Sequence, residues 1–245
     1  MTRTSLGLPK RVAWSAALIL LLGLLAFKAG KEGLSNFYVQ SAHLEIQRWA
    51  KPGQAYRAED WTRVMHYLAS SLRYSPGNPW ALEESGTLQL RSMSAARDPQ
   101  LAEAAARSAN VDFRMALVQR PTSPFSWASF ALTKLYLGEQ DDELVKALLR
   151  AEELGPWEPG VQQTVVFVGL SVWNRLNQAG QAAVLRAMQR GAQHNAAKIA
   201  EIAMTFNRID LFCAISKMTS QGREVCSRIS KSGKNSSKQN KGATP

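Results

Sequence analysis

Pro121-Thr122-Ser123-Pro124 stands near the middle of this 245-residue chain, and the same proline pattern occurs on both sides of it. Pro76-Gly77-Asn78-Pro79 lies before it and Pro156-Trp157-Glu158-Pro159 lies after it, so that the first prolines are 45 and then 35 residues apart. The sequence between these motifs is rich in helix-forming residues. Because a proline cannot continue a helix and is favoured at the first position of the next one, each motif predicts a turn between two helices.

The residues that precede the three motifs match one another in size and polarity. The residue is small five positions before the first proline, large and apolar eight positions before it, and apolar twelve positions before it. The small residues are Ser71, Ala116 and Ala151, the large ones are Leu68, Phe113 and Leu148, and the third set is Val64, Ala109 and Leu144. Spacings of three, four and seven residues define one face of a helix. We therefore predict that the three large residues are buried at equivalent places, where the small residues let neighbouring helices approach.

One of these units resembles the tetratricopeptide repeat. Residues 135–144 read Leu-Tyr-Leu-Gly-Glu-Gln-Asp-Asp-Glu-Leu, and with Ala147, Ala151 and Pro156 they are similar to the inter-helix turn, second helix and closing proline of that family. The resemblance covers residues 61–160 well and 161–210 loosely, and it implies an all-α helical-repeat solenoid. The family period is about 34 residues. The longer first interval therefore implies about ten additional residues, which we expect near Ala95–Glu103.

An uncharged run near the N-terminus predicts a membrane anchor. Residues 12–27 contain neither charge nor proline, and basic residues flank the run on both sides. A spanning helix needs about 20 residues, and snorkelling by Lys28 extends the span to residues 12–30. The alternative is a cleaved signal peptide, but the residues at 24–26 and 27–29 make poor cleavage sites. The basic excess before the span predicts a single-pass inner-membrane protein with a cytoplasmic N-terminus (1–11) and a periplasmic C-terminal domain.

The net charge of +11 lies entirely at the two ends of the chain. Residues 32–216 contain 18 basic and 18 acidic residues, whereas residues 217–245 contain seven basic residues and one acidic residue. A folded nucleic-acid-binding protein usually has its basic surface on the folded part, so we expect no nucleic-acid partner. The composition after Ser216 predicts a basic, largely disordered tail over 216–245, with disorder from about Ser230. This tail either binds an anionic partner or only aids solubility.

The remaining sequence predicts further helices and no strands, because the alternation of apolar and polar residues typical of strands is missing. A helix is expected from Leu34 to the break at 51–53, and others are expected over 161–176, 182–193 and 196–215. Together with the anchor and the tail, these helices define a helical-repeat domain over 31–215. The predicted fold class is therefore all-α, with a tetratricopeptide-like solenoid behind a single N-terminal transmembrane helix.

No pattern in the sequence points to catalysis, to a cofactor or to a metal. The three histidines have no partner at a metal-binding or catalytic spacing, and phosphate-binding loops and nucleophile motifs are missing. The acidic run 141–143 is interpreted as charge at a helix N-terminus, which offsets the helix macrodipole. We therefore predict no enzyme activity and no catalytic, cofactor-binding or metal-binding residues. Cys213 and Cys226 form either a disulfide in an oxidising compartment or two free thiols, and the sequence does not decide between these.

Four tryptophans lie at or shortly after the proline motifs and in the helix that follows: Trp80, Trp127, Trp157 and Trp173. One interpretation is packing between repeats, and the other is an aromatic surface for a partner helix or a sugar ring. Because the concave face of a helical solenoid usually binds extended or helical segments, these four residues are the candidate partner-binding residues.

The layout also resembles bacterial exopolysaccharide-biosynthesis accessory proteins of the VpsP type, which combine a short N-terminal anchor with a divergent tetratricopeptide-like body. The stretches 74–81 and 120–128 are similar to the repeat tails of polysaccharide polymerases and O-antigen ligases. The resemblance implies a membrane-anchored scaffold that assists exopolysaccharide or O-antigen biosynthesis or export by protein–protein interaction. The implied partners are polymerase or export components of an envelope complex. The alternative is a different periplasmic assembly factor, in cytochrome maturation or in a pilus or cell-wall complex.

Overall fold

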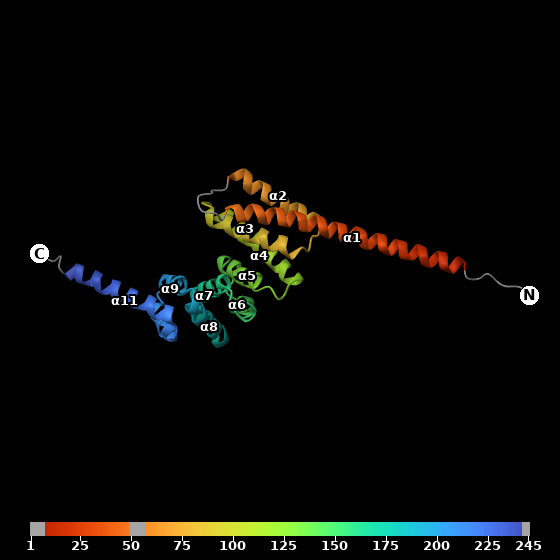
Figure 1. The fold of residues 1–245 in the computed structure, drawn as a ribbon. Coiled ribbons are helices and arrows are strands. Elements are labelled where there is room, and N and C mark those ends of the chain that lie inside the picture. Colours follow the sequence, from red (N-terminus) through yellow and green to blue (C-terminus); the bar gives the residue numbers. More distant parts are fainter. Residues whose placement is uncertain (1–7, 50–56, 242–245) are drawn as a thin grey trace, which may run out of the picture. The chain divides into compact units, whose positions relative to one another are not determined.

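A computed structural model describes residues 8–49 and 57–241, and within this part of the chain all regular structure is helical (Figure 1). The helices are α1 (Leu8–Trp49), α2 (Ala58–Tyr74), α3 (Pro79–Ala95), α4 (Pro99–Gln119), α5 (Pro124–Tyr136), α6 (Asp142–Leu154), α7 (Pro159–Ser171), α8 (Gln178–His194), α9 (Ala196–Thr205), α10 (Ile209–Ile215) and α11 (Ser220–Lys241). The prediction of an all-α fold is confirmed for the described residues. The chain divides into two compact units between Ser85 and Gly86, inside α3, whereas the predicted helical-repeat domain over 31–215 is a single domain.

Helix α1 contains the predicted anchor and continues into the first unit without a break. It is long and apolar enough to span a membrane, and every side chain from residue 12 to residue 30 is exposed. From Lys31 onward, buried and half-buried positions recur along α1, and α2 packs along this part of the helix (Figure 1). The helix predicted to begin at Leu34 and the predicted membrane span are therefore parts of the same helix, because no proline or turn sequence separates them.

Small residues bring α1 and α2 together. Ser35 and Ala42 lie seven residues apart on one face of α1, and both are fully buried. The hydroxyl of Ser35 is 2.8 Å from that of Ser71, the small residue predicted five positions before the first proline motif. Asn78 of that motif donates to the Ser35 hydroxyl at 2.9 Å. The turn between α2 and α3 is thus held on the face of α1.

The three proline motifs form the same turn. The residue before the first proline donates its backbone N–H to the carbonyl of the small residue, at 2.9 Å for Ser71, 2.8 Å for Ala116 and 3.0 Å for Ala151. The third residue of each motif then begins the next helix, which has the second proline at its first position. The large residues Leu68, Phe113 and Leu148 are all at most 1% exposed, which confirms their predicted burial.

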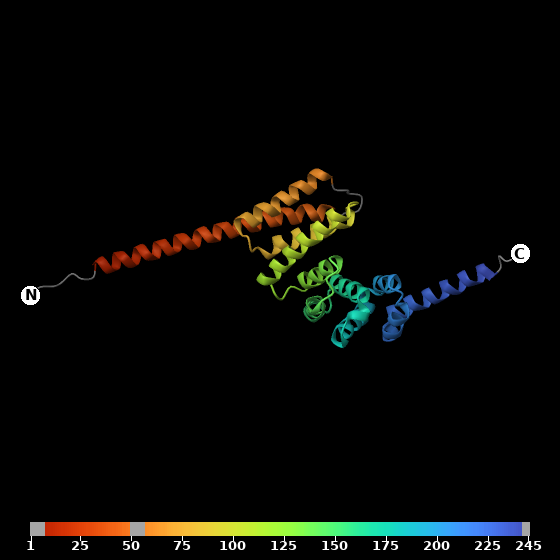
Figure 2. The same cartoon turned by 180° about the vertical axis from the view of Figure 1, so that it is seen from behind.

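In the second unit, helices pack on the next helix and on the next but one. Helix α5 packs on α6 and on α7, α7 packs on α8 and on α9, and α6 packs on α8, as the two views of the ribbon show (Figures 1 and 2). Gly169 marks one close approach, since a Cβ there would lie 2.1 Å from Cγ2 of Val184. Val165 and Val168 of α7, and Val172 directly after it, are all buried in this core.

The additional residues of the first interval lengthen two helices near the predicted place. Helices α3 and α4, which end and begin on either side of residues 96–98, have 17 and 21 residues, whereas α5 and α6 have 13 each. One predicted helix differs from the structure. The predicted helix over 196–215 is broken into α9 and α10. The cause is Asn207, whose φ of +54° ends α9 in the left-handed conformation that asparagine tolerates.

The predicted tail also differs from the structure. Cys213 and Cys226 form a disulfide that joins α10 to α11, and Val225 and Ile229 pack against the core. These contacts give the first turns of α11 the buried apolar surface that the tail composition alone does not suggest. The helical backbone then continues through Lys241, where the composition predicts disorder.

Candidate functional site

An open groove crosses α5, α7 and α9, with a volume of about 310 Å³. It is lined by Leu132 and Tyr136 from α5, Thr164 and Phe167 from α7, and Lys198 and Ile202 from α9, among others. On each helix these residues are three or four positions apart, so that one face of each helix contributes to the same groove. The groove is therefore a product of helix stacking, since residues 66 positions apart in sequence line it together.

The groove has an apolar interior and a polar edge. Leu132, Phe167 and Ile202 are buried or half-buried, and the ring of Phe167 packs edge-on against Phe206 at 5.3 Å. At the edge, the ammonium of Lys198 pairs with both carboxylate oxygens of Glu201 at 2.9 Å. Such a combination of apolar anchors and a charged rim is typical of sites that bind a segment of another protein.

A second hollow, of about 480 Å³, lies between α6 and α8 around Glu152. The Glu152 side chain is only 5% exposed, and Arg186 binds it through Nε at 3.1 Å and through Nη2 at 2.7 Å. Arg190, on the same helix as Arg186, also binds Oε1 of Glu152. This bonding raises the pKa of Arg186, although burial opposes it. The buried carboxylate is therefore neutralised within the fold, and it joins α6 to α8.

The four tryptophans predicted to bind a partner do not line the groove. Trp80 belongs to the first unit, and the other three belong to the second. Trp157 lies in the turn between α6 and α7, is 58% exposed, and stacks under the guanidinium of Arg190 at 5.7 Å. It thus adjoins the hollow around Glu152. Trp80 is also exposed, at the start of α3.

Trp127 and Trp173 are half-buried and pack against the core of the second unit. The indole N–H of Trp127 donates to the carbonyl of Pro121 at 2.8 Å, which closes the turn before α5. Trp173 lies just after α7, at the opposite end of that helix from Trp157, and Arg208 lies over its ring at 5.9 Å. Thirteen residues of α7 correspond to roughly 20 Å. The tryptophans of the second unit therefore do not form one surface.

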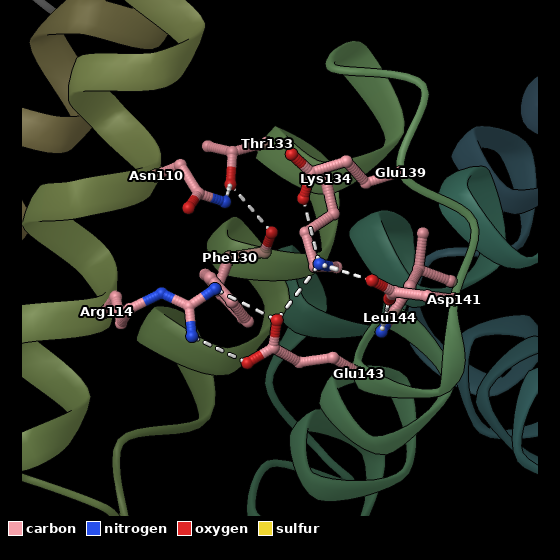
Figure 3. A network of polar contacts seen from close by, with 9 residues as sticks. All are labelled: Asn110, Arg114, Phe130, Thr133, Lys134, Glu139, Asp141, Glu143 and Leu144. Carbon is pink, nitrogen blue, oxygen red and sulfur yellow. Dashed lines mark hydrogen bonds and ion pairs between the residues drawn. The ribbon is translucent and has the colours of Figure 1, made fainter.

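A buried lysine organises the turn between α5 and α6 (Figure 3). The Lys134 side chain is 2% exposed, and its ammonium lies 2.9 Å from Glu139, 3.0 Å from Asp141 and 3.0 Å from Glu143. Arg114 of α4 reaches the same cluster, with two hydrogen bonds to Glu143 at 2.7 and 2.9 Å. The cluster thus connects α4, α5 and α6 through charged side chains.

The backbone of this turn explains why the three carboxylates converge. Gly138 has a φ of +72°, and Glu139 N–H donates to the carbonyl of Lys134 at 2.9 Å, which is the hydrogen bond of a Schellman ending. Asp141 is the N-cap of α6, where its side chain accepts from Leu144 N–H at 3.0 Å. The interpretation of the acidic run as helix N-terminal charge is confirmed. Lys134 is not among the residues predicted from the sequence, although a lysine inside an apolar helical stretch and five residues before a glutamate is a usable signal.

The cluster shifts the pKa of its members in opposite directions. Burial by itself would lower the pKa of Lys134, but hydrogen bonds to the three carboxylates outweigh it and raise that pKa. The bond from Arg114 lowers the pKa of Glu143, and Lys134 adds to this effect. Burial opposes the shift at Asp141, but hydrogen bonds from Lys134 and from Leu144 N–H lower its pKa as well.

We expect the protein to lose stability in acid through this cluster. Carboxylates with a lowered pKa stabilise the fold fully above their ordinary values, 3.8 for Asp141 and 4.5 for Glu143, and this contribution is lost as the pH falls through the lowered values. Melting temperatures of the full chain in detergent, measured from pH 6 to pH 3, test this. The Glu143→Gln variant should melt lower at pH 6 and should lose less on acidification. Parallel curves for both proteins would contradict the role of Glu143.

The groove and the hollow differ in what they can do. The charges around the hollow bind one another within the fold, whereas the groove is open and is lined by apolar side chains from three helices. Of the two, the groove is the better candidate for binding a segment of another protein. Comparisons with models of protein families, with curated proteins and with solved structures give no match to this chain.

Proposed function

We propose that the protein is a membrane-anchored scaffold of an envelope polysaccharide system, in which a tetratricopeptide-like body binds a segment of a partner protein. The groove across α5, α7 and α9 is the observation that carries this proposal. Three stacked helices that each contribute one face form the type of surface on which helical repeats bind extended or helical segments. The partner supplies apolar side chains for the interior near Phe167 and polar groups for the rim at Lys198.

Two further features support a place in the cell envelope. The exposed, uncharged part of α1 suits a lipid environment, and its flanking charges favour a body outside the cytoplasm. The disulfide between Cys213 and Cys226 suits an oxidising compartment such as the periplasm. The link to exopolysaccharide or O-antigen biosynthesis rests on the resemblance described for the proline motifs.

A photo-crosslinking experiment tests the groove. A benzophenone amino acid in place of Tyr136, which is exposed at the edge of the groove, should form an adduct with a polysaccharide polymerase or export component in the native cell. The same amino acid in place of Trp157, which is exposed outside the groove, is the matched control. Equal adducts from both positions would contradict a groove-specific partner. An adduct with a cytochrome-maturation, pilus or cell-wall component would replace the polysaccharide system by that assembly.

The anchor is tested separately. Residues 12–30 are expected to hold the mature protein in the membrane, because their side chains are apolar and exposed and the nearby cleavage sites are poor. The protein should stay with the membrane pellet in alkaline carbonate, and N-terminal mapping should find the start of the chain intact. A mature protein that starts near Phe27 or Gly30 would show a cleaved signal peptide.

A further inference from the structure

Helix α4 is apolar on two opposite faces. One face contributes Ala106, Ala109, Phe113, Ala116 and Leu117 to the core of the second unit. The other face is exposed to solvent and consists of Leu101, Ala104, Ser108, Val111, Met115 and Val118, which we call the outer stripe. Val118 is 75% exposed, and Leu101 and Val111 are more than half exposed. An exposed apolar face of this length often marks an interaction site, so the outer stripe calls for an explanation.

The outer stripe has the spacing of a coiled-coil seam. Its residues follow one another at intervals of three, four, three, four and three, which places Leu101, Ser108 and Met115 at position a of a heptad. Ala104, Val111 and Val118 are then at position d. The stripe runs for about 26 Å along α4, long enough for two and a half heptads. This spacing suits another helix that lies alongside α4.

The fold itself does not require apolar residues on this face. Equivalent positions of α2, α4 and α6 are found by counting back from the first proline of the motif that follows each helix. Three such positions lie ten, six and three residues before that proline. Where α4 has Val111, Met115 and Val118, the equivalent residues of α6 are Lys146, Arg150 and Glu153, and those of α2 are His66, Ser70 and Arg73. All three in α6 are exposed, as are His66 and Arg73. The apolar outer face is thus specific to α4.

We propose that the outer stripe is a dimer interface, in which α4 pairs in parallel with α4 of a second copy of this chain. Arg107 is at position g and Asp112 at position e of the heptad, and a parallel pair places Arg107 of each copy beside Asp112 of the other. An antiparallel pair would instead bring Arg107 and Arg114 of one copy near the same arginines of the other. Self-pairing therefore satisfies charge complementarity in the parallel arrangement only.

The surroundings of α4 fit this arrangement. The f positions, Ala106 and Phe113, are buried, so the core of the second unit lies on the side of α4 away from the seam. Arg107 pairs with Glu103 on the surface, and an exposed pair of this kind contributes little, so it can exchange for a contact across the dimer. Asp112 is half-buried and accepts from Gln89 at 3.0 Å, so the contact with Arg107 of the other copy adds to this hydrogen bond and does not replace it.

A lipid surface fits the outer stripe less well. Beside the stripe, Glu103 and Asp112 balance Arg107 and Arg114, so the helix offers no net positive charge to anionic headgroups. The dimer is independent of the proposed function and holds whatever the groove binds.

Cysteine cross-linking in the membrane tests the proposal on the full chain. Val111→Cys, at a d position, should give a disulfide-linked dimer under mild oxidation. Glu103→Cys, exposed on the same helix but outside the stripe, should give little more than the wild-type chain, whose own cysteines are bonded to each other. A cross-link that forms only when Val111→Cys and Ser108→Cys chains are mixed would show antiparallel pairing and overturn the parallel dimer. A monomer only, or an adduct only with another protein, would overturn the dimer itself.

The oligomeric state of a variant with charged residues in the outer stripe is the second measurement. The double variant Val111→Lys with Met115→Arg gives α4 the residues that α6 has at the same positions. It should keep the wild-type helix content and melting profile of the dilute monomer, since α6 tolerates these residues on the same face. In detergent, sedimentation should shift from dimer to monomer. A variant that remains dimeric while folded would show that the outer stripe is not the interface.

Discussion

Replacing Phe113 with alanine is expected to lower the free energy of unfolding by about 3–5 kcal/mol, because it removes a large side chain from a packed core. Phe113 is 1% exposed and packs against α3, where a Cβ on Gly86 would lie 2.9 Å from the ring. Gly86 has no side chain that could fill the space left by the ring, and the proline turn after α4 holds the end of that helix in place. The cavity left by the replacement should therefore persist. Chemical denaturation of the full chain in detergent, followed by the helical signal, measures the loss.

Phe125→Ala is the matched control for this variant. Phe125 is at the start of α5 and is about half exposed, so its replacement should change the free energy of unfolding by less than about 1 kcal/mol. An equal effect of both replacements, or an unchanged unfolding curve for Phe113→Ala, would contradict the central place assigned to this ring.

Replacing Lys134 with methionine is expected to cost about 2–4 kcal/mol, because it leaves Glu139, Asp141 and Glu143 close together without their shared cation. The lysine is 2% exposed but the carboxylates are 38–55% exposed, so water compensates part of the loss and keeps it below that of a fully buried pair. Methionine preserves the length of the side chain and its packing. The effect therefore reports on charge rather than on volume.

Lys146→Met is the control for Lys134→Met, since it removes the same charge from an exposed position on the neighbouring α6. It should change stability by no more than about 0.5 kcal/mol. The deficit of Lys134→Met should also shrink in acid, where protonation relieves the repulsion among the carboxylates. A deficit that stays constant from pH 6 to pH 3 would show that repulsion among these groups is not its cause.

The proline turns could be predicted because all their determinants are local. A proline, the small residue five positions before it and the large residue eight positions before it act within one helix end, and the structure buries Leu68, Phe113 and Leu148 as expected. The apolar span could be predicted for the same reason, from a run of residues in a single helix. Predictions of this kind need no knowledge of which helices are neighbours.

The candidate site could not be predicted because it joins helices that are distant in sequence. The groove needs Tyr136 and Ile202 on one surface, and only the stacking of α5, α7 and α9 brings them together. The four tryptophans are candidates because of their place in the sequence near the turns, but that place does not determine which face of a helix points to the groove. Long-range contacts also decide the C-terminal region, where the disulfide and Ile229 join the first turns of α11 to the core. The helix then continues past Ser230, where the local composition predicts disorder.

The unbroken course of α1 has a mechanical consequence. No hinge separates residues 12–30 from the part of α1 that packs on α2. The helix therefore acts as a rigid rod that fixes two quantities: the distance of the rest of the first unit from residues 12–30, and its rotation about the α1 axis. From residue 30 to residue 49 the helix measures about 29 Å. One residue inserted there would move the rest of the unit along the helix axis by about 1.5 Å and rotate it about that axis by about 100°. Seven inserted residues would move it by about 10 Å and return it nearly to its original orientation. A neighbour in the membrane that contacts both residues 12–30 and the first unit would therefore be affected more by the rotation of the unit about the α1 axis than by its distance from the membrane.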